Sequence, residues 1–474
     1  RMDEITDLYQ NIDFNNIDYN KLAALELRLT KSYYDYCAGM KFGFFDPCKL
    51  YPDEYFIVTQ KPDSLFTRKL FSNPDSLTFY LDDVQPITKE YQLLQDELVR
   101  MQALTDSVIH KIPLITDKQT IKYGDKHPSV PLIARRLMIS GELPYNASYK
   151  TMYTTFNSTL LKALNQFREK YNLLIDKEIG NQTIQALNRD FGNQYWTVAA
   201  NLERLRWTPQ KTISTKYVHV NVANMTLSAM RNDDLVLRMH VCVGEGPDHK
   251  TPLLYGKMYE IVLNPTWTVP NNIIINEISK KMVNDPSYLS RNNMKVYKNR
   301  EPVDEYSAQW NKINKNYQPY VIVQDSGANN SLGRIKFNFG NPFDVYLHDT
   351  NVKSAFSRHN RAISHGCVRV QKPLDLAFFC LNDVDSTKQK LVNQNNLKKD
   401  KIRYSIGLQP LTQIGKDSII GKDILKLSKV ELRPGVSILL DYRTCFSGKN
   451  GDVQFCNDHY KMDSLLIAKI KSAK

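Results

Sequence analysis

The hydrophobic pattern divides the chain into a helical first part and a β-rich second part. Apolar side chains recur at helical spacing near residue 165 and mark one face of a helix: Leu160, Leu161, Leu164, Phe167 and Tyr171. From about residue 195 the pattern changes, and residues 217–222 alternate with the period of two that is typical of a strand. The sequence therefore predicts an α+β protein with its helices and strands in separate regions.

Two helical regions are expected before the strands begin. Residues 1–125 read as a mainly helical N-terminal scaffold, with short helical stretches around 22–29 and 91–99 and several prolines between them. Residues 126–192 read as a small three-helix domain, in which a turn at 174–180 precedes the third helix. A structural spacer is one interpretation of this small domain.

Residues 193–474 are predicted to form a mostly-β domain. Its expected strands cover 217–222, 235–244, 259–264, 320–323 and 344–348. Between the third and the last of these strands lies an insertion, about 271–335, that begins with a helical pattern and continues as a polar stretch rich in Gly and Asn. This composition makes the insertion a candidate for a mobile lid.

Charge and composition limit the classes of partner. The 474 residues carry 63 Lys and Arg against 50 Asp and Glu, a formal net charge of +13 that favours an anionic partner such as nucleic acid, a membrane surface or an acidic wall polymer. Zinc-finger spacing and a basic region interleaved with aromatics are both missing from the sequence, which argues against nucleic acid. No apolar run approaches the roughly 20 residues of a membrane span. Because the chain starts at Arg1, we expect that a leader was removed or trimmed.

The cysteines leave one structural question open. There are seven, so at least one thiol is unpaired. Cys445 and Cys456 flank an Asn450-Gly451 pair, and a two-residue turn there would place the two thiols opposite each other. A disulfide and two half-buried free thiols are both compatible with this pattern, and Cys37 and Cys48 are a second close pair.

The candidate chemistry lies in the strand at 345–348 and in the segment Ser364-His365-Gly366-Cys367-Val368-Arg369. A cysteine after glycine can sit on a tight turn, where a nearby histidine can accept its proton. Backbone N–H groups at Gly366 and Cys367 could form an oxyanion hole. These parts suggest acyl transfer through a thioester. A zinc site made by His348, His359, His365 and Cys367 is the rival, but it lacks the usual ligand spacing.

This motif resembles the signature of the L,D-transpeptidase family with a YkuD-type catalytic domain. The shared pattern is a His, a gap of fifteen residues, then Ser-His-Gly-Cys, an apolar residue and Arg. Residues 201–207, 264–270 and 440–455 resemble its large, YcbB-like branch, and residues 126–192 resemble a peptidoglycan-binding domain, although Asp176-Lys177 replaces the usual Asp-Gly turn. The resemblance implies a YkuD-type β-sandwich with a helical capping insertion.

By this resemblance Cys367 is the nucleophile and His348 the general base. The backbone carbonyl of Asp349 would orient the imidazole, while the role of its carboxylate stays open. His365 and Gly366 would line the oxyanion hole with Cys367.

The remaining motif residues are assigned supporting or substrate-binding roles. Ser364 is expected to hydrogen-bond within the loop, and Arg369 either holds a substrate carboxylate or braces the loop. Tyr346 and Trp267 are candidate substrate contacts.

The implied reaction joins peptidoglycan stem peptides by 3→3 cross-links, with release of D-Ala and without a metal or cofactor. The implied location is the cell envelope, periplasmic or secreted, and carbapenems are the expected covalent inhibitors. An L,D-carboxypeptidase or endopeptidase would use the same nucleophile and base, and an inactive peptidoglycan-binding protein is the non-enzymatic alternative. The intact His348 and Cys367 argue against the last of these.

Overall fold

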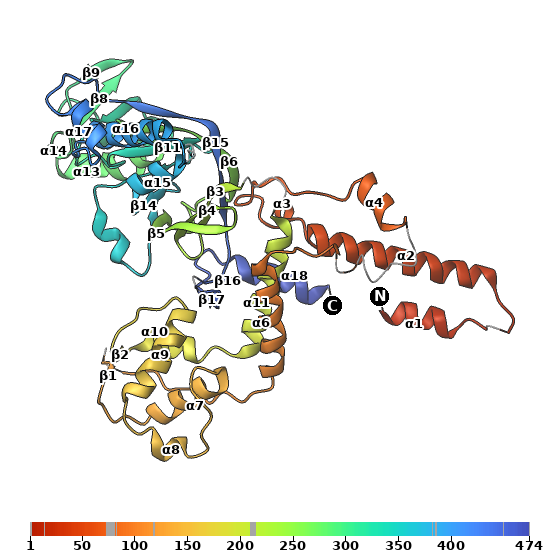
Figure 1. The fold of residues 1–474 in the computed structure, drawn as a ribbon. Helices are drawn as coiled ribbons and strands as arrows, with labels where there is room; N and C mark the ends of the chain where they lie inside the picture. The colour runs from red at the N-terminus through yellow and green to blue at the C-terminus, as the bar shows by residue number, and fades with distance from the viewer. Residues whose placement is uncertain are drawn as a thin grey trace. The chain divides into compact units, whose positions relative to one another are not determined.

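The computed structural model describes residues 2–13, 15–72, 81, 83–116, 119–208, 215–381, 383, 386–448 and 450–473 (Figure 1). Its contacts divide the chain into two compact units. One unit contains residues 1–212 and 443–474, and the other contains residues 213–442. No helix among the described residues is long and apolar enough to cross a membrane.

The first unit begins with a helical scaffold, as its sequence predicts. Its helices are α1 (Met2–Gln10), α2 (Tyr19–Phe42), α3 (Pro47–Leu50), α4 (Ser64–Leu70), α6 (Lys89–Leu104) and α11 (Phe191–Trp207). The buried Glu203 on α11 accepts the backbone N–H groups of Phe44 and Phe45 at 2.6 and 2.9 Å. Gly43 ends α2 with φ +95°, and a Cβ there would lie 2.4 Å from the ring of Trp207, so only glycine fits this approach.

A small helical domain occupies the middle of this unit. It consists of α7 (Val130–Ser140), α8 (Tyr149–Met152), α9 (Ser158–Lys170), α10 (Asn181–Leu187) and a short antiparallel ribbon of β1 (Ile121–Lys122) and β2 (Glu178–Ile179). The buried Arg168 donates to the carbonyl of Asp176 at 2.7 Å and forms a 3.0 Å ion pair with its carboxylate. Arg168 thus holds the turn in which Asp176-Lys177 stands.

The C-terminal segment belongs to the helical unit and not to the β domain, which differs from the predicted domain of residues 193–474. Strands β16 (Cys445–Ser447) and β17 (Val453–Phe455) form a hairpin, and α18 (Met462–Ser472) follows it. Cys445, Val453 and Phe455 are buried in the core made by the helices. In addition, Arg204 of α11 forms a buried 2.5 Å ion pair with Asp463 of α18. These non-local contacts move both α11 and the C-terminus out of the predicted domain.

The register of this hairpin contradicts the predicted opposition of Cys445 and Cys456. Cys445 pairs with Phe455, and Ser447 pairs with Val453, which is not the register of a two-residue turn at Asn450-Gly451. All seven cysteines lie among the described residues and all are free thiols. The observed register is shifted by one residue, which turns neighbouring side chains to opposite faces.

The second unit is built on a nine-stranded sheet. Its strand order is β13-β5-β14-β12-β11-β6-β15-β3-β4. The bounds are β3 (Lys216–Asn221), β4 (Thr226–Arg231), β5 (Asp234–Gly244), β6 (Leu254–Leu263), β11 (Ile335–Phe339), β12 (Leu347–His348), β13 (Ala362–Ser364), β14 (Val368–Val370) and β15 (Lys429–Asp441). The long β5 pairs with β4 along its first part and with β14 and β13 near its end, so the hydrogen-bonded sheet closes on itself.

The insertion after β6 has its own hydrophobic core and its own four-stranded sheet, in the order β7-β10-β8-β9. Its elements are β7 (Trp267–Thr268), α12 (Asn271–Ile273), the π-helix η2 (Ile274–Ile278), α13 (Ser279–Asn284), α14 (Tyr288–Arg291), β8 (Met294–Lys298), β9 (Glu301–Val303), the 3-10 helix η3 (Trp310–Lys312) and β10 (Tyr320–Gln324). The prediction of a helical insertion is therefore incomplete. Strands β8 and β9 are short and polar on one side, so their pattern is weak. Pairing with β10 stabilises β8, and pairing with β8 stabilises β9.

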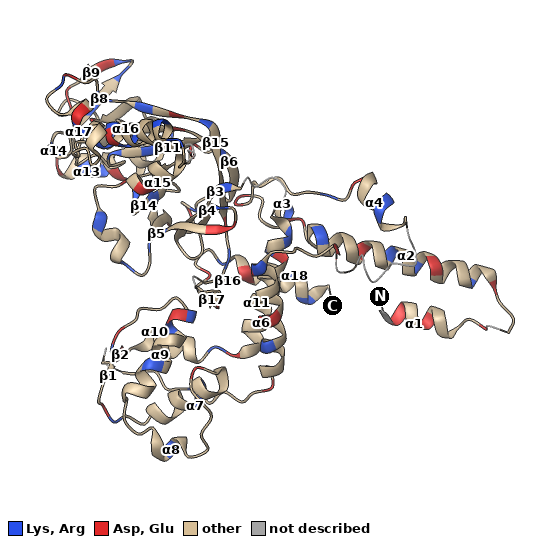
Figure 2. Cartoon of the chain, viewed as in Figure 1, with Lys and Arg blue, Asp and Glu red and all other residues tan. Residues whose placement is uncertain are grey.

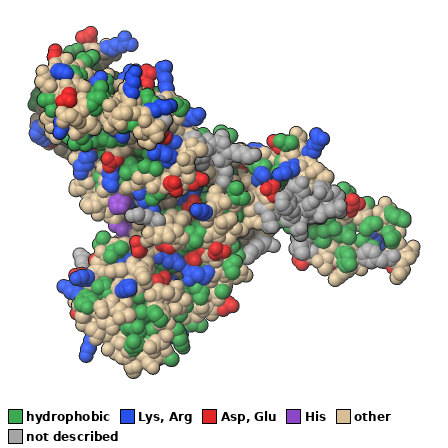
Figure 3. Space-filling view, in the orientation of Figure 1, with side chains coloured by type: hydrophobic (Ala, Val, Ile, Leu, Met, Phe, Trp, Pro, Cys, Tyr) green, Lys and Arg blue, Asp and Glu red, His purple; other side chains and the backbone are tan. Residues whose placement is uncertain are grey.

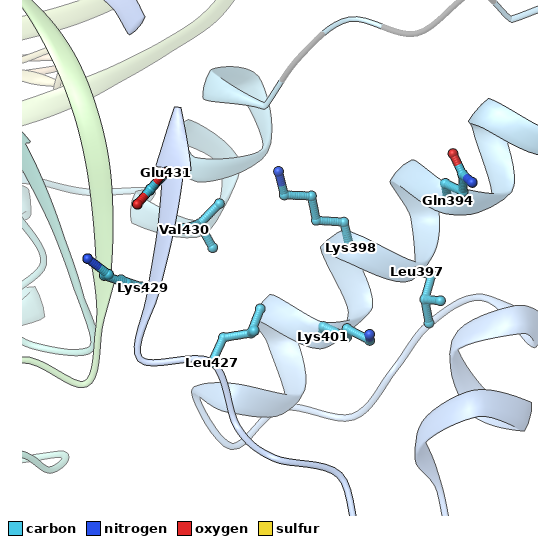
Figure 4. A pocket seen from close by; sticks show the side chains of 8 residues that line it. All are labelled: Gln394, Leu397, Lys398, Lys401, Leu427, Lys429, Val430 and Glu431. Atoms are coloured by element: carbon cyan, nitrogen blue, oxygen red, sulfur yellow. The ribbon is translucent and has the colours of Figure 1, made fainter. Parts of the chain in front are cut away.

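A second helical segment links β14 to β15 and was not singled out from the sequence. It contains α15 (Pro373–Cys380), α16 (Gln389–Ser405) and α17 (Gln413–Ile419), and it is rich in Lys (Figure 2). A hollow of about 360 Å³ lies between α16 and the start of β15, where Lys398, Lys401 and Lys429 surround apolar side chains (Figure 4). The space-filling view shows Lys and Arg scattered over the visible surface with acidic side chains between them (Figure 3).

Candidate active site

The sheet register brings the motif residues to one face of the second unit. His348 on β12 pairs with Lys336 on the antiparallel β11 and with Arg369 on the parallel β14. Because side chains alternate along a strand, these three share a face. The intervening residues Phe337, Leu347 and Val368 are fully buried on the opposite face. The alternation thus separates a hydrophobic core from a row of ionisable groups.

Cys367 lies directly before β14 and next to Tyr346. The Val368 N–H donates to the Tyr346 carbonyl at 3.1 Å. Cys367, which precedes β14, therefore lies next to Tyr346, which precedes β12. Burial raises the pKa of Tyr346, and the neighbouring side chains of Cys367 and Trp267 also shift it. The aromatic rings of Tyr346 and His348 lie 5.6 Å apart, centroid to centroid. The four predicted residues Tyr346, His348, Cys367 and Trp267 therefore belong to one site.

His348 is buried and held in one orientation. Its Nδ1 lies 2.5 Å from the backbone carbonyl of Asp349, which assigns the proton to Nδ1 and leaves Nε2 as an acceptor. Burial, together with the positive charges of Arg369 and Lys336, lowers the pKa of His348 to about 3. The imidazole is therefore neutral at neutral pH and can accept a proton.

The Asp349 carboxylate has a structural role that the sequence left open. Its Oδ2 accepts the Arg334 N–H at 2.9 Å, its Oδ1 accepts the Thr350 N–H at 2.7 Å, and Lys353 forms an ion pair with it. The carboxylate therefore fixes the backbone whose carbonyl holds His348. Gly333 makes room for it, because a Cβ at that position would lie 2.4 Å from the Asp349 carboxyl carbon, and its φ of +62° also favours glycine.

Hydrogen bonds also fix the loop that carries the thiol. Gly366 has a φ of +111°, and its carbonyl accepts the Thr251 hydroxyl at 2.8 Å. The Ser364 hydroxyl donates to the Cys367 carbonyl at 2.6 Å and accepts the Gly366 N–H at 3.2 Å. Thr251 comes from the loop after β5, more than a hundred residues before the motif, and no local pattern in the sequence marks it.

These bonds determine which N–H groups can face an oxyanion. The Gly366 N–H is directed to Ser364, whereas the Cys367 N–H makes no hydrogen bond with any residue that the structure describes. The His365 side chain turns away from the thiol, and its Nε2 contacts the carboxylate of Glu277 on η2. Its ring also packs 4.7 Å from that of His249, centroid to centroid. The Cys367 N–H is thus the available oxyanion donor among the predicted ones.

The thiol itself is partly exposed and protonated at rest. Burial raises the pKa of Cys367, although hydrogen bonds with Tyr346 and the charges of Lys336 and Arg369 act in the opposite direction. His348 is neutral as well, so the two candidate groups rest as a thiol and an imidazole instead of a thiolate and an imidazolium. A thiol in this state needs a base to accept its proton before it can act as a nucleophile.

Two cations at the site form no ion pair with any acidic residue that the structure describes. Among the described residues, the buried Nε of Arg369 has no hydrogen-bond partner, so no bracing bond accounts for it. Lys336, which the motif does not include, places its Nζ 4.0 Å from the centroid of the Tyr346 ring. Lys336 alternates with the buried Ile335 and Phe337, so the sequence places it on the exposed side of a strand. Only the pairing of β11 with β12 shows that this side of the strand carries the site.

The residues of the zinc alternative do not assemble as a metal site in this structure. His365 turns to Glu277, and His348 is held by the Asp349 carbonyl. Within the described ranges, no three His, Cys, Asp or Glu side chains are grouped so that they could hold a metal ion.

Comparison with known proteins identifies the domain that carries this geometry. Residues 215–407 match the L,D-transpeptidase catalytic domain family (YkuD), and residues 2–98 match a family described as a scaffold domain. A Haemophilus influenzae protein provisionally named an L,D-transpeptidase is 34% identical over 221 residues, which cover 45% of this chain and 44% of that protein. The chain therefore aligns with less than half the length of this relative.

Solved structures of L,D-transpeptidases are also similar to parts of the chain. One from Mycobacterium smegmatis is 12% identical with a TM-score of 0.21, and the match covers 36% of this chain and 55% of that one. Another, solved in complex with imipenem, is 14% identical with a TM-score of 0.20 and covers 35% and 53%. At these TM-scores the structural matches carry no argument about activity.

Proposed function

We propose that the chain transfers peptidoglycan stem peptides through a thioester on Cys367, since residues 215–407 match the L,D-transpeptidase catalytic domain family. One observation carries the proposal. The buried, neutral His348 is held through Nδ1 and shares a sheet face with the segment that bears Cys367, so its Nε2 is free to accept the thiol proton.

In the first half-reaction His348 Nε2 takes the Cys367 proton while the sulfur attacks the carbonyl carbon of the third stem residue. The Cys367 N–H stabilises the tetrahedral oxyanion. The C–N bond to the fourth residue then breaks, and the leaving amine of D-Ala takes the proton from the imidazolium. A thioester and a neutral imidazole remain.

In the second half-reaction the side-chain amine of another stem attacks the thioester. His348 accepts a proton from this amine, the C–S bond breaks, and the thiolate recovers its proton. The product is a 3→3 cross-link. Hydrolysis would follow the same path with water as the acceptor, so a carboxypeptidase or endopeptidase differs only in its second half-reaction.

The surroundings of Cys367 suggest how stem peptides would bind. The side chains of Trp267 and Cys367 both act on the Tyr346 phenol, so Tyr346 and Trp267 would contact the donor near the thiol. Glu277 of the insertion reaches His365, so the insertion would cap the bound donor. The net charge of +13 suits a wall polymer that carries carboxylates, and the helices of residues 126–192 would hold that polymer in the cell envelope.

Covalent capture by imipenem tests the nucleophile and the base. We expect the intact protein to gain the mass of one imipenem, with the adduct on the peptide that contains Cys367, since the β-lactam carbonyl mimics the scissile carbonyl. Cys367→Ala should gain no mass, and His348→Ala should acylate at least about a hundredfold more slowly, as is typical for the loss of a general base. Unchanged wild-type protein, or an adduct on another cysteine, would contradict the assignment.

A further inference from the structure

Lys336 is a half-buried cation that faces the nucleophile without an acidic partner. It pairs with His348 across β11 and β12, and its Nζ lies 4.0 Å from the centroid of the Tyr346 ring. The Tyr346 carbonyl in turn accepts the N–H of Val368, the residue that follows Cys367, at 3.1 Å. Within the part of the chain that the structure describes, no carboxylate oxygen comes within 4.0 Å of this ammonium group.

The two nearest acids do not neutralise it. Burial lowers the pKa of Lys336, while Cys367, Asp344 and Glu260 act at longer range in the opposite direction. The Glu260 carboxylate is already engaged, because it accepts Asn338 Nδ2 at 3.0 Å and pairs with Lys429 at 3.3 Å. Asp344 is exposed to solvent. A partly desolvated ammonium group without a partner is costly, so an anion that binds beside it is favoured.

Arg369 supplies a second cation on the same row of the sheet. It pairs with His348 from the other side, across β12 and β14, and its buried Nε lacks a partner among the described residues. His348 is therefore flanked by two uncompensated positive charges. An anion bound at the thiol would be attracted by both.

The chemistry of the donor places a carboxylate there. In a peptide whose scissile bond is its last, the terminal carboxylate carbon is three bonds from the carbonyl carbon under attack, so it lies only about 4 Å away by standard bond lengths. We propose that Lys336, together with Arg369, binds the free terminal carboxylate of the donor and selects substrates cleaved one residue from that end. This inference deepens the proposed function and rests on it.

Alkylation of Cys367 tests whether the charge of Lys336 attracts an anion to the thiol, and this test does not require the transferase reaction. The thiolate attacks the CH2 carbon of iodoacetate or of iodoacetamide and displaces iodide, and the two reagents differ mainly in charge. The rate of each would be measured on the Cys367 peptide by mass spectrometry, for the wild type, Lys336→Met and Lys336→Arg. Lys398→Met, on the exposed face of α16, removes the same charge from the same unit and is the matched control.

We expect Lys336→Met to lower the ratio of the iodoacetate rate to the iodoacetamide rate by about tenfold, the order expected for one charge at close range in a partly buried site. Lys336→Arg and Lys398→Met should keep the wild-type ratio. An unchanged ratio in Lys336→Met, or an equal loss of both rates, would overturn the inference, because the lysine would then not attract an anion. Thermal unfolding of each variant checks that the fold is intact.

The outcome is separable from that of the proposed function. If imipenem fails to acylate Cys367 while the alkylation ratio depends on Lys336, the anion site stands and the transferase proposal fails. If acylation succeeds and the ratio does not change, only the carboxylate site is lost. A substrate measurement completes the test: kcat/KM for a tetrapeptide with a free carboxylate, divided by that for its C-terminal amide, should fall in Lys336→Met.

Discussion

Replacing Asp349 by alanine should loosen the second unit and misplace His348, because the carboxylate fixes the backbone whose carbonyl holds this imidazole. The substitution removes the acceptor of two backbone N–H groups, those of Arg334 and Thr350, and one ion pair with Lys353. The Lys353 side chain is 55% exposed, so its ion pair contributes at most about 1 kcal/mol. Each N–H that loses a buried acceptor costs about 1–3 kcal/mol. The free energy of unfolding should therefore fall by roughly 2–6 kcal/mol.

Three variants divide this loss into its parts. Asp349→Asn keeps one acceptor oxygen and should lose about half as much as Asp349→Ala, while Lys353→Met should lose at most about 1 kcal/mol. The assay is urea unfolding at neutral pH, followed by tryptophan fluorescence, together with the imipenem acylation rate of each variant. Acylation should slow in the same order, since the Asp349 carbonyl orients His348. If the free energy of unfolding of Asp349→Ala lies within about 0.5 kcal/mol of the wild-type value, the structural role assigned to the carboxylate is wrong.

Two further predictions concern protonation. The pKa of His348 is about 3 in the folded chain and lies below its ordinary value of 6.5. Between these two pH values the unfolded chain therefore binds more protons than the folded chain. The free energy of unfolding of the wild type should fall as the pH decreases from about 6.5 to about 3. His348→Gln should lack this part of the decline, and identical pH profiles would contradict the burial of a neutral imidazole. Because burial raises the pKa of Cys367, alkylation of this thiol by iodoacetamide should keep rising about tenfold per pH unit up to pH 8.5. A plateau near pH 6 would instead indicate a preformed thiolate–imidazolium pair.

Local patterns in the sequence predicted many elements of the fold. The alternation at 217–222 and 235–244 corresponds to β3 and β5, and the apolar run at 320–323 corresponds to β10. The predicted register of the C-terminal hairpin was wrong, because its strands do not pair as a two-residue turn at Asn450-Gly451 would require. The sheet closes because β5 pairs both with the neighbouring β4 and with the distant β14 and β13, and Cys445 packs into a core made by helices far away in the sequence. No local pattern encodes either of these long-range contacts.

The candidate site shows the same division. The spacing of His348 and Cys367 and the residues between them were sufficient to name the nucleophile and base candidates, and the fold brings Tyr346, Trp267 and Arg369 to the same place. Lys336, Thr251 and Glu277 could not be found in this way. Each contacts the site through a strand register or a loop contact from elsewhere in the chain, and each residue type is ordinary at its own position.

The most direct test of the account is the mass of the products formed from a disaccharide-tetrapeptide. The wild type should form dimers that have lost one D-Ala, and Cys367→Ala should form none. Treatment of these dimers with an endopeptidase specific for 4→3 bonds should leave them intact, since their link is 3→3. Disaccharide-tripeptide monomers as the sole product would show hydrolysis and contradict transpeptidation, and an unchanged tetrapeptide under conditions where imipenem acylates Cys367 would contradict the assigned donor.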